Sequence, residues 1–301
     1  MKKEKNISYS INSISEQHRL LSLAKPEHPL ISIFNFEDIV INTEELSKNF
    51  TLNFYCIAIK RNYKGKLKYG QNYYDFDEGI MSFISPNQLL STTADESATE
   101  GCCLVFHSDF IAHYPLAKAI KNYGFFSYSL NEALHLSEKE ELLIINILEN
   151  IQQEYSSVID QFSQDVIVSQ IELLLNYCNR FYNRQFITRK NVNSDLLTKL
   201  ETVLNTFFDS NVGLPTVQKI AEQLNVSQNY LSDMLKSQTG QTAQQHIHDK
   251  LIERAKVILT STNLSVSEIA YQLGFEYPQS FNKLFKNKTN ISPLEYRNSF
   301  Y

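Results

Sequence analysis

Cysteine is scarce in this sequence, and its arrangement excludes the common cysteine-based sites. The chain has 4 cysteines, and none of them forms a Cys-x-x-Cys pair or a histidine-spaced cluster, so neither a zinc knuckle nor a thioredoxin-like site is encoded. Cys102 and Cys103 are adjacent, and in a strand they would point to opposite faces. That arrangement is typical of buried free thiols in a reducing compartment.

Long apolar runs are also absent. No window of the sequence reaches the ~18 consecutive apolar residues that a membrane-spanning helix needs. Residues 1–17, MKKEKNISYSINSISEQ, carry charge but no apolar central region, which excludes a signal peptide. We therefore expect a cytoplasmic protein with no membrane partner.

The chain has no overall excess of basic charge. Its 28 lysines and arginines stand against 33 aspartates and glutamates, for a net charge of −5, which argues mildly against nucleic-acid binding by the chain as a whole. The charge is uneven, because residues 196–301 hold 10 basic and 9 acidic side chains. Only this C-terminal part can approach a polyanion without net repulsion. The length of 301 residues is that of about two domains.

The N-terminal part is expected to form a β-barrel. From about residue 30 to residue 108 the sequence has period two, and in runs such as Phe54–Ile59 and Cys102–His107 apolar residues occupy both faces. Short strands at roughly ten-residue spacing indicate an all-β barrel. Its aromatic residues are interpreted as core, with the lining of a ligand cavity as the alternative. They are Phe34, Phe36, Phe54, Tyr69, Phe83 and Phe106.

Two amphipathic helices are predicted after the strands. The first begins with a capping box at Ser137–Glu140. The second lies between Gln164 and Tyr182. It carries an apolar stripe at helical spacing, which is either intramolecular core or a dimer seam. The stripe consists of Ile167, Ile171, Leu174 and Cys178.

A polar, basic stretch follows the second helix. Residues 179–194 lose the apolar period and include arginines and a lysine but no acid. They are the best candidate for a linker. The predicted organisation is therefore an N-terminal domain over 1–178, a linker over 179–194 and a C-terminal domain over 195–301.

The C-terminal part contains an internal repeat. The run IAEQLN at residues 220–225 is echoed by IAYQLG at residues 269–274, and MLK at residues 234–236 is echoed by LFK at residues 284–286. Each copy predicts a short helix, a tight turn and a second helix. The sequence therefore predicts a doubled helix-turn-helix.

The turn residues of the two copies support this interpretation. The small Ala221 and Ala270 permit a close helix crossing. Asn225 and Gly274 are residue types that tolerate the left-handed conformation that such a turn requires. The two units are expected at about 216–237 and 266–287.

Residues 216–297 combine the two repeats with a connecting helix. Their text includes IAEQLNVSQNYLSDMLKSQTG, then IHDKLIERAKVIL, then SVSEIAYQLGFEYPQSFNKLFKNKTNISPLEYR. It resembles the DNA-binding domain of AraC/XylS-type transcriptional regulators. The resemblance implies an all-α, seven-helix, homeodomain-like C-terminal domain. The N-terminal part is similar to the family's sensor domains only in architecture, which implies a cupin-like β-barrel with trailing helices in a multi-domain α+β chain.

The first recognition helix is expected to start at the N-cap Ser227 and to bury Leu231, Met234 and Leu235. In a helix-turn-helix, the second helix enters the major groove with its N-terminal residues toward the base edges. The side chains left for the DNA are Gln228, Asn229, Ser232 and Asp233.

The second recognition helix is expected to carry Pro278 in its first turn, where the missing N–H costs nothing, and to bury Phe281, Leu284 and Phe285. Glutamine and asparagine can bind adenine bidentately, and lysine favours guanine. The candidates for base contact are Gln279, Asn282 and Lys283, and those for phosphate contact, which positions the protein, are Ser280, Lys286 and Lys288.

Asp233 departs from the family pattern, because many relatives carry arginine in the first recognition helix. An anion facing the groove repels phosphates unless it accepts a hydrogen bond from cytosine N4 or pairs internally. This argues against base contact by Asp233. The second copy is therefore expected to carry more of the readout.

The resemblance implies a sequence-specific regulator whose two recognition helices enter successive major grooves. Its expected partners are double-stranded promoter DNA and RNA polymerase, with a small-molecule effector and a second copy of the chain as further candidates, in the bacterial cytoplasm at the nucleoid. Because the resembling regulators often dimerise through a helix before the linker, the stripe on the second helix is interpreted as a dimer seam. Whether a promoter is activated or repressed stays open.

The alternative is a cupin-type enzyme with an accessory DNA-binding tail. Such an enzyme needs a metal cluster or an activated nucleophile. His107 and His113 are isolated, and His246 and His248, two positions apart on a helix, do not face each other. We therefore expect no enzymatic activity, no metal and no cofactor.

Overall fold

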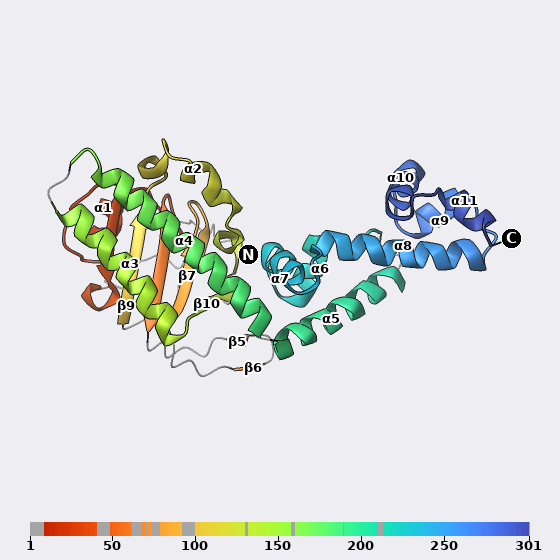
Figure 1. The fold of residues 1–301 in the computed structure, drawn as a ribbon, viewed down its shortest axis with the longest axis horizontal. Coiled ribbons are helices and arrows are strands. Elements are labelled where there is room, and N and C mark those ends of the chain that lie inside the picture. The colour runs from red at the N-terminus through yellow and green to blue at the C-terminus, as the bar shows by residue number, and fades with distance from the viewer. Residues whose placement is uncertain are drawn as a thin grey trace, which may run out of the picture. The chain divides into compact units, whose positions relative to one another are not determined.

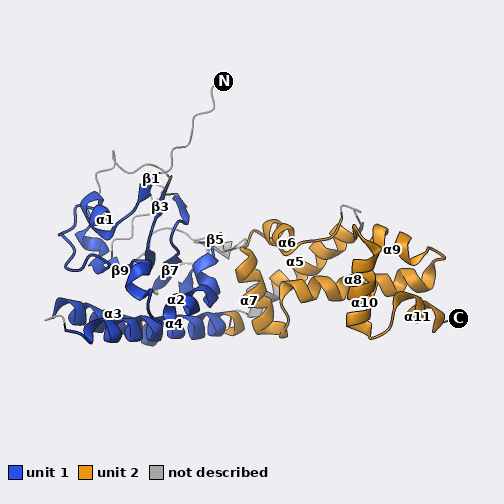
Figure 2. Ribbon diagram, turned by 90° about the horizontal axis from the view of Figure 1, so that it is seen from above, with its two compact units in different colours: residues 1–185 blue, residues 186–301 orange. Residues whose placement is uncertain are grey.

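The chain divides into two compact units, residues 1–185 and 186–301 (Figure 2). The computed structural model describes residues 9–40, 49–61, 68–69, 72–73, 79–91, 100–129, 132–157, 160–188, 190–209 and 213–300. Among these residues, no helix combines the length and the apolar character needed to span a bilayer.

Unit 1 is built on a five-stranded antiparallel sheet with the strand order β10-β7-β4-β9-β2 (Figure 1). The register pairs Ile57 with both Phe83 and Leu104, so these three side chains share one face of the sheet. The strands are β2 (Ile31–Asn35), β4 (Tyr55–Arg61), β7 (Ile80–Ile84), β9 (Glu100–Phe106) and β10 (Leu134–His135).

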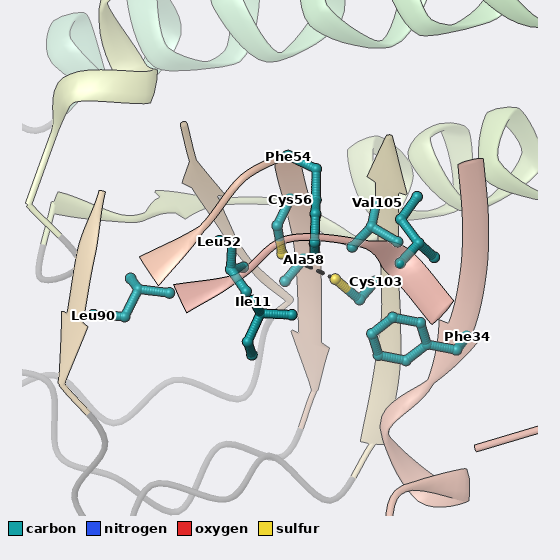
Figure 3. Close-up of a cluster of buried hydrophobic side chains, with 10 residues drawn as sticks. Ile11, Phe34, Leu52, Phe54, Cys56, Ala58, Leu90, Cys103 and Val105 are labelled. Atoms are coloured by element: carbon teal, nitrogen blue, oxygen red, sulfur yellow. Dashed lines mark hydrogen bonds between the residues drawn. The ribbon is translucent and has the colours of Figure 1, made fainter. Parts of the chain in front are cut away.

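A second, three-stranded sheet covers the face of the five-stranded sheet that lies opposite to the side chain of Ile57. It consists of β1 (Tyr9–Ile11), β3 (Asn49–Leu52) and β8 (Leu89–Ser91), in the order β1-β3-β8. A buried cluster joins Ile11, Leu52 and Leu90 of this sheet to side chains of β2, β4 and β9, as Figure 3 shows. The core of unit 1 therefore lies partly between two sheets. A separate two-stranded ladder pairs β5 (Lys68–Tyr69) with β6 (Asn72–Tyr73).

The predicted closed barrel is not confirmed, because the strands that the structure describes pair into separate sheets rather than into one ring. The apolar pattern on both faces of the central strands is real: Ile57 and Ala58 of β4 are both buried. A strand covered by a second sheet on one face and by helices on the other has the same pattern as a barrel strand. Periodicity alone does not separate these architectures.

Two long helices, α3 (Glu138–Ser156) and α4 (Ser163–Thr188), cover the remaining face of the five-stranded sheet (Figure 1). The backbone N–H of Ile33 donates to Tyr155 Oη on α3 at 2.9 Å. The Sγ atom of Cys178 on α4 lies 3.9 Å from Met81 Sδ on β7. The predicted capping box is confirmed, since the backbone N–H of Ser137 donates to Glu140 Oε2 at 2.9 Å.

Four of the aromatic residues interpreted as core are buried in unit 1. Phe34, Phe54, Phe83 and Phe106 are buried, whereas Phe36 is half-buried and the side chain of Tyr69 lies outside what the structure describes. Unit 1 also contains short helical segments, which are α1 (Ile14–Leu20), η1 (Phe36–Asp38), η2 (Ser108–Ile111), α2 (Leu116–Ala119), η3 (Ile120–Asn122) and η4 (Gly124–Ser127).

The apolar stripe of α4 belongs to the core, so its interpretation as a dimer seam is wrong. Ile171, Leu174 and Cys178 are 0% exposed and Ile167 is 3% exposed. The stripe faces the five-stranded sheet, as the contact between Cys178 and Met81 indicates. The periodicity of a helix shows that it has an apolar face, but not whether that face meets its own chain or another one.

We expect the substitution Ile171→Glu to unfold unit 1, because it places an unpaired carboxylate in an apolar core. Leu173→Glu is the matched control: Leu173 lies on the same helix and is 42% exposed, so its change should stay within about 0.5 kcal/mol. Thermal unfolding followed by circular dichroism compares the two variants. An Ile171→Glu protein with the midpoint of the wild type would contradict the assignment of this stripe to the core.

Helix α4 continues beyond the residues predicted to end the N-terminal domain. Residues 179–188 are helical, and Phe181, Tyr182 and Phe186 are buried, so the apolar period does not end at Cys178. The next helix, α5 (Lys190–Asp209), begins directly afterwards. The predicted boundaries at residues 178 and 195 stay a prediction.

Unit 2 contains the predicted doubled helix-turn-helix, with an all-helical architecture over its described residues. The first pair is α6 (Val217–Leu224) and α7 (Gln228–Thr239), and the second is α9 (Val266–Gln272) and α10 (Pro278–Thr289). Helix α8 (Ala243–Ser261) connects them and packs against helices of both pairs. Helix α5 packs against α6, and α11 (Pro293–Asn298) packs against α8.

Both tight turns have the predicted left-handed backbone. Asn225 has a φ of 55° and Gly274 a φ of 90°. Ala221 and Ala270 are 1% and 0% exposed, consistent with a close crossing. A side chain at Gly274 would also collide with the backbone, since a Cβ atom there would lie 2.5 Å from the carbonyl carbon of Gly213.

We expect Gly274→Ala to destabilise unit 2 by more than ~3 kcal/mol, because backbone strain and a backbone collision add. Gly240→Ala is the control: Gly240 has a φ of 76°, but a Cβ atom there would meet nothing within 4 Å, so its cost should be about 1–2 kcal/mol of left-handed strain. Urea unfolding of both variants gives the comparison. Equal losses of stability would mean that the close approach to Gly213 is unimportant.

Candidate nucleic-acid interface

The first recognition helix, α7, begins where the sequence predicts. The Ser227 hydroxyl accepts from the backbone N–H of Tyr230 at 3.2 Å, which satisfies one of the free N–H groups of the first turn. Leu231, Met234 and Leu235 are 0% exposed, so their predicted burial is confirmed. Of the four residues predicted to face DNA, Gln228 and Asn229 are exposed, and Ser232 and Asp233 are half-exposed.

Sequence reasoning missed Tyr230, which is 2% exposed. Its ring packs edge-on against Phe186, with 5.2 Å between the centroids, and burial raises the pKa of its phenol. The Gln238 side chain of the same helix donates to the carbonyl oxygen of Phe186 at 3.1 Å. The signal was present, because Tyr230 lies four residues before Met234 on the same face of the helix.

The second recognition helix, α10, has Pro278 at its first position, as predicted. Phe281 and Phe285 are 1% and 0% exposed. Leu284, predicted to be buried, is only half-buried. The predicted contact residues Gln279, Ser280, Asn282, Lys283 and Lys286 are exposed, and Pro278 is half-exposed.

The two ends of α10 therefore differ in their polar chemistry. Its first turns present amide, hydroxyl and ammonium groups to solvent, from Gln279 to Lys283. In its last turn, the Lys288 ammonium donates to Asp249 Oδ1 on α8 at 2.6 Å. Hydrogen bonds from Ser292 and, to a smaller extent, the charge of Lys286 lower the pKa of Glu295.

Helix α8 gives both recognition helices a common support. It starts with a capping box in which the backbone N–H of Thr242 donates to Gln245 Oε1 at 2.8 Å. At its other end, Arg297 Nε of α11 donates to the carbonyl oxygen of Leu259 at 2.9 Å. Its interior face consists of Ala243, Ile247, Leu251, Ile252, Ala255 and Leu259.

The two histidines of α8 have different neighbours. His246 Nε2 lies 2.8 Å from Thr239 Oγ1, whereas His248 Nε2 lies 2.7 Å from Gln244 Nε2. Within the part of the chain that the structure describes, no group of three or more histidine, cysteine, aspartate or glutamate side chains could hold a metal ion.

Comparison with known proteins shows what the C-terminal region of this chain is similar to. A family model described as a helix-turn-helix domain matches residues 220–299. The HTH-type transcriptional regulator YobQ of Bacillus subtilis is 35% identical over 86 residues, which cover 29% of this chain and 36% of that protein. The xylose operon regulatory protein of Escherichia coli K12 is 32% identical over 81 residues, which cover 27% of this chain and 21% of that protein.

Among solved structures, the C-terminal domain of AraT, a response regulator from Geobacillus stearothermophilus, is 30% identical; the match covers 35% of this chain and 84% of that one, with a TM-score of 0.32. The chain spans about a third or less of the length of the curated relatives it matches. The residues that the family model matches lie in unit 2. Residues 220–299 of this chain are an AraC-type helix-turn-helix domain.

Proposed function

We propose that this protein is a sequence-specific transcriptional regulator that inserts α7 and α10 into successive major grooves of promoter DNA. One observation carries the proposal: in each helix-turn-helix, the second helix buries an apolar face and exposes amide and hydroxyl side chains in its first two turns. Those are the groups that read base edges and phosphates in the major groove. Two relatives that match 29% and 27% of this chain bear the names of regulators.

The proposed roles follow from side-chain chemistry. Gln279, Asn282 and Lys283 read bases in the second groove, while Ser280 and Lys286 contact phosphates. In the first groove Gln228, Asn229 and Ser232 make the contacts. The half-exposed Asp233 contributes less, because its charge opposes the phosphates.

Unit 1 is proposed to modulate DNA binding, through a bound effector or through self-association, in the manner of a cupin-like sensor. Its support is a separate core of two sheets and two long helices, in a unit of its own. A ligand can change DNA affinity only through its differential affinity for two arrangements of the protein, typically 1–3 kcal/mol. RNA polymerase is the proposed partner at the promoter, in the cytoplasm.

We expect the full chain to retard duplex DNA in a gel shift, with an affinity that falls steeply as salt rises. Neutralised phosphates release counterions, so the logarithm of the association constant falls by ~0.9 per contacted phosphate for each tenfold increase in salt. Footprinting should show two protected segments about one helical turn, ~34 Å, apart. A single protected segment, or binding that salt does not change, would contradict the two-groove arrangement.

The readout and positioning roles can be separated by two variants of the same helix. Gln279→Ala should cost ~1–3 kcal/mol on the preferred site and relax the preference at one base pair. Lys286→Ala should weaken binding to all sequences about equally and reduce the salt slope by ~1. Both side chains are exposed, so neither change should alter the fold. Selection from a randomised duplex library tests the assignment, which fails if both variants give the same profile.

A further inference from the structure

One carboxylate on the connecting helix contacts groups that belong to both helix-turn-helix units. Asp249 Oδ2 accepts from Gln241 Nε2 at 2.9 Å, and Asp249 Oδ1 accepts from Lys288 Nζ at 2.6 Å. Gln241 lies just after the C-terminal end of α7, and Lys288 lies in the last turn of α10. One oxygen of the carboxylate thus contacts the residue that follows the C-cap of α7, and the other contacts the last turn of α10.

Lys288 occupies the same repeat position as Gln238, and both residues anchor the last turn of a recognition helix. Thr239 and Thr289, which follow them directly, each donate to the carbonyl oxygen four residues earlier at 2.8 Å. Gln238 donates to the carbonyl oxygen of Phe186, whereas Lys288 donates to Asp249. The anchoring position is therefore shared by the two units, and in the second unit its anchor is an ion pair with the connecting helix.

We propose that Asp249 is a positioning residue, which holds Lys288 as a brace that sets the orientation of α10 relative to α8 and hence to α7. This inference rests on the proposed function, since orientation has a consequence only if both recognition helices bind one DNA molecule. It also assigns Lys288 to an ion pair within the protein rather than to a phosphate contact.

Because the ion pair lies at one end of α10, a small tilt of this helix moves the proposed base-reading residues at its other end. Gln279 lies nine residues before Lys288 on α10, which is about 14 Å along the helix at 1.5 Å per residue. A tilt of about 10° around the brace would therefore move Gln279 by ~2 Å. Because hydrogen bonds lose most of their strength over such a displacement, a small change at one end of α10 alters base contact at the other end.

The brace is suited to orientation rather than to folding. The side chains of Lys288 and Asp249 are 29% and 37% exposed, and ion pairs of this kind contribute little to stability. The fold of α10 depends instead on the buried Phe281 and Phe285. Burial and then the Lys288 charge lower the pKa of the neighbouring His248, while the Asp249 charge raises it to a smaller extent.

The test compares four variants of the full chain: Asp249→Asn, Lys288→Met, both together, and the exchange of Asp249→Lys with Lys288→Asp. The probe is a labelled duplex of about 40 base pairs recovered from a randomised library by the wild type, with two further versions in which one half or the other is scrambled. We expect each single variant to bind the intact duplex about threefold to fivefold more weakly. The double variant should match the single variants, and the exchange should restore affinity.

The selective readout is the comparison with half-sites. On the duplex whose α10 half is scrambled, all four variants should bind as the wild type does, because orientation of α10 no longer matters there. The slope of affinity against salt should be unchanged in Lys288→Met. The control Lys286→Met, two residues earlier and exposed, should reduce the slope by ~1. A purely structural loss would weaken binding to every duplex and lower the melting temperature.

Two results would overturn the brace. If Lys288→Met reduces the salt slope by ~1 while Asp249→Asn strengthens binding, Lys288 is a phosphate contact that Asp249 masks. If all variants bind the intact duplex like the wild type, the pair has no role in positioning. Failure of the wild type to recover any duplex from the library would instead contradict the proposed function.

Discussion

The C-terminal unit depends on the burial of the apolar face of α8 between two small helix pairs. A helix-turn-helix of two short helices is too small to enclose a core of its own, because small structures bury too little of their surface. Helix α8 supplies the missing surface to both pairs, from Ala243 at one end to Leu259 at the other. The orientation of both recognition helices therefore depends on one element.

The two helix-turn-helix units repeat in structure more closely than in sequence. Helices α7 and α10 both end at a residue with a left-handed backbone, Gly240 with a φ of 76° and Asn290 with a φ of 66°. Both are followed by a capping box, begun by Thr242 and by Ser292, that starts the next helix. Asparagine and glycine serve here as equivalents, because both tolerate the left-handed region.

The units differ in what surrounds this common frame. The first unit buries Tyr230 against Phe186. The second buries Phe281 and Phe285 against each other, and Phe285 also packs against Tyr296. The first recognition helix carries Asp233 where the second carries Lys283. Equivalent positions of the two recognition helices therefore carry side chains of opposite charge.

In the N-terminal unit, the sandwich of a five-stranded and a three-stranded sheet places two thiols in the core. The Sγ atoms of Cys56 and Cys103 lie 3.0 Å apart in the cluster between the sheets (Figure 3). The hydrogen bond between Cys103 and Cys56, together with burial, raises the pKa of Cys103 well above its usual range, and burial raises the pKa of Cys102 to about 11. Cys102 and Cys103 are therefore protonated at neutral pH, and the buried Cys103 acts as an apolar packing group.

The sequence by itself determined the elements whose cause is local. These elements follow from residue type and spacing over a few positions. They are the cap at Ser227, the turns at Asn225 and Gly274, the start of α10 at Pro278 and the burial of Met234. The sequence also determined the repeat, because both copies keep the same order of small, apolar and turn residues. The resemblance of residues 216–297 to one family of DNA-binding domains also followed from the amino-acid sequence of this segment.

Only the tertiary structure decided which surface each apolar face meets. The apolar stripe of α4 that includes Ile171 packs on the five-stranded sheet of the same chain. The central strands of that sheet lie between a second sheet and two helices, and the described strands do not form a closed barrel. It likewise decided that Lys288 meets Asp249, a residue far away in the chain. The physical reason is the same throughout: periodicity and side-chain chemistry specify that a group must be covered or paired, whereas the partner depends on how distant segments pack.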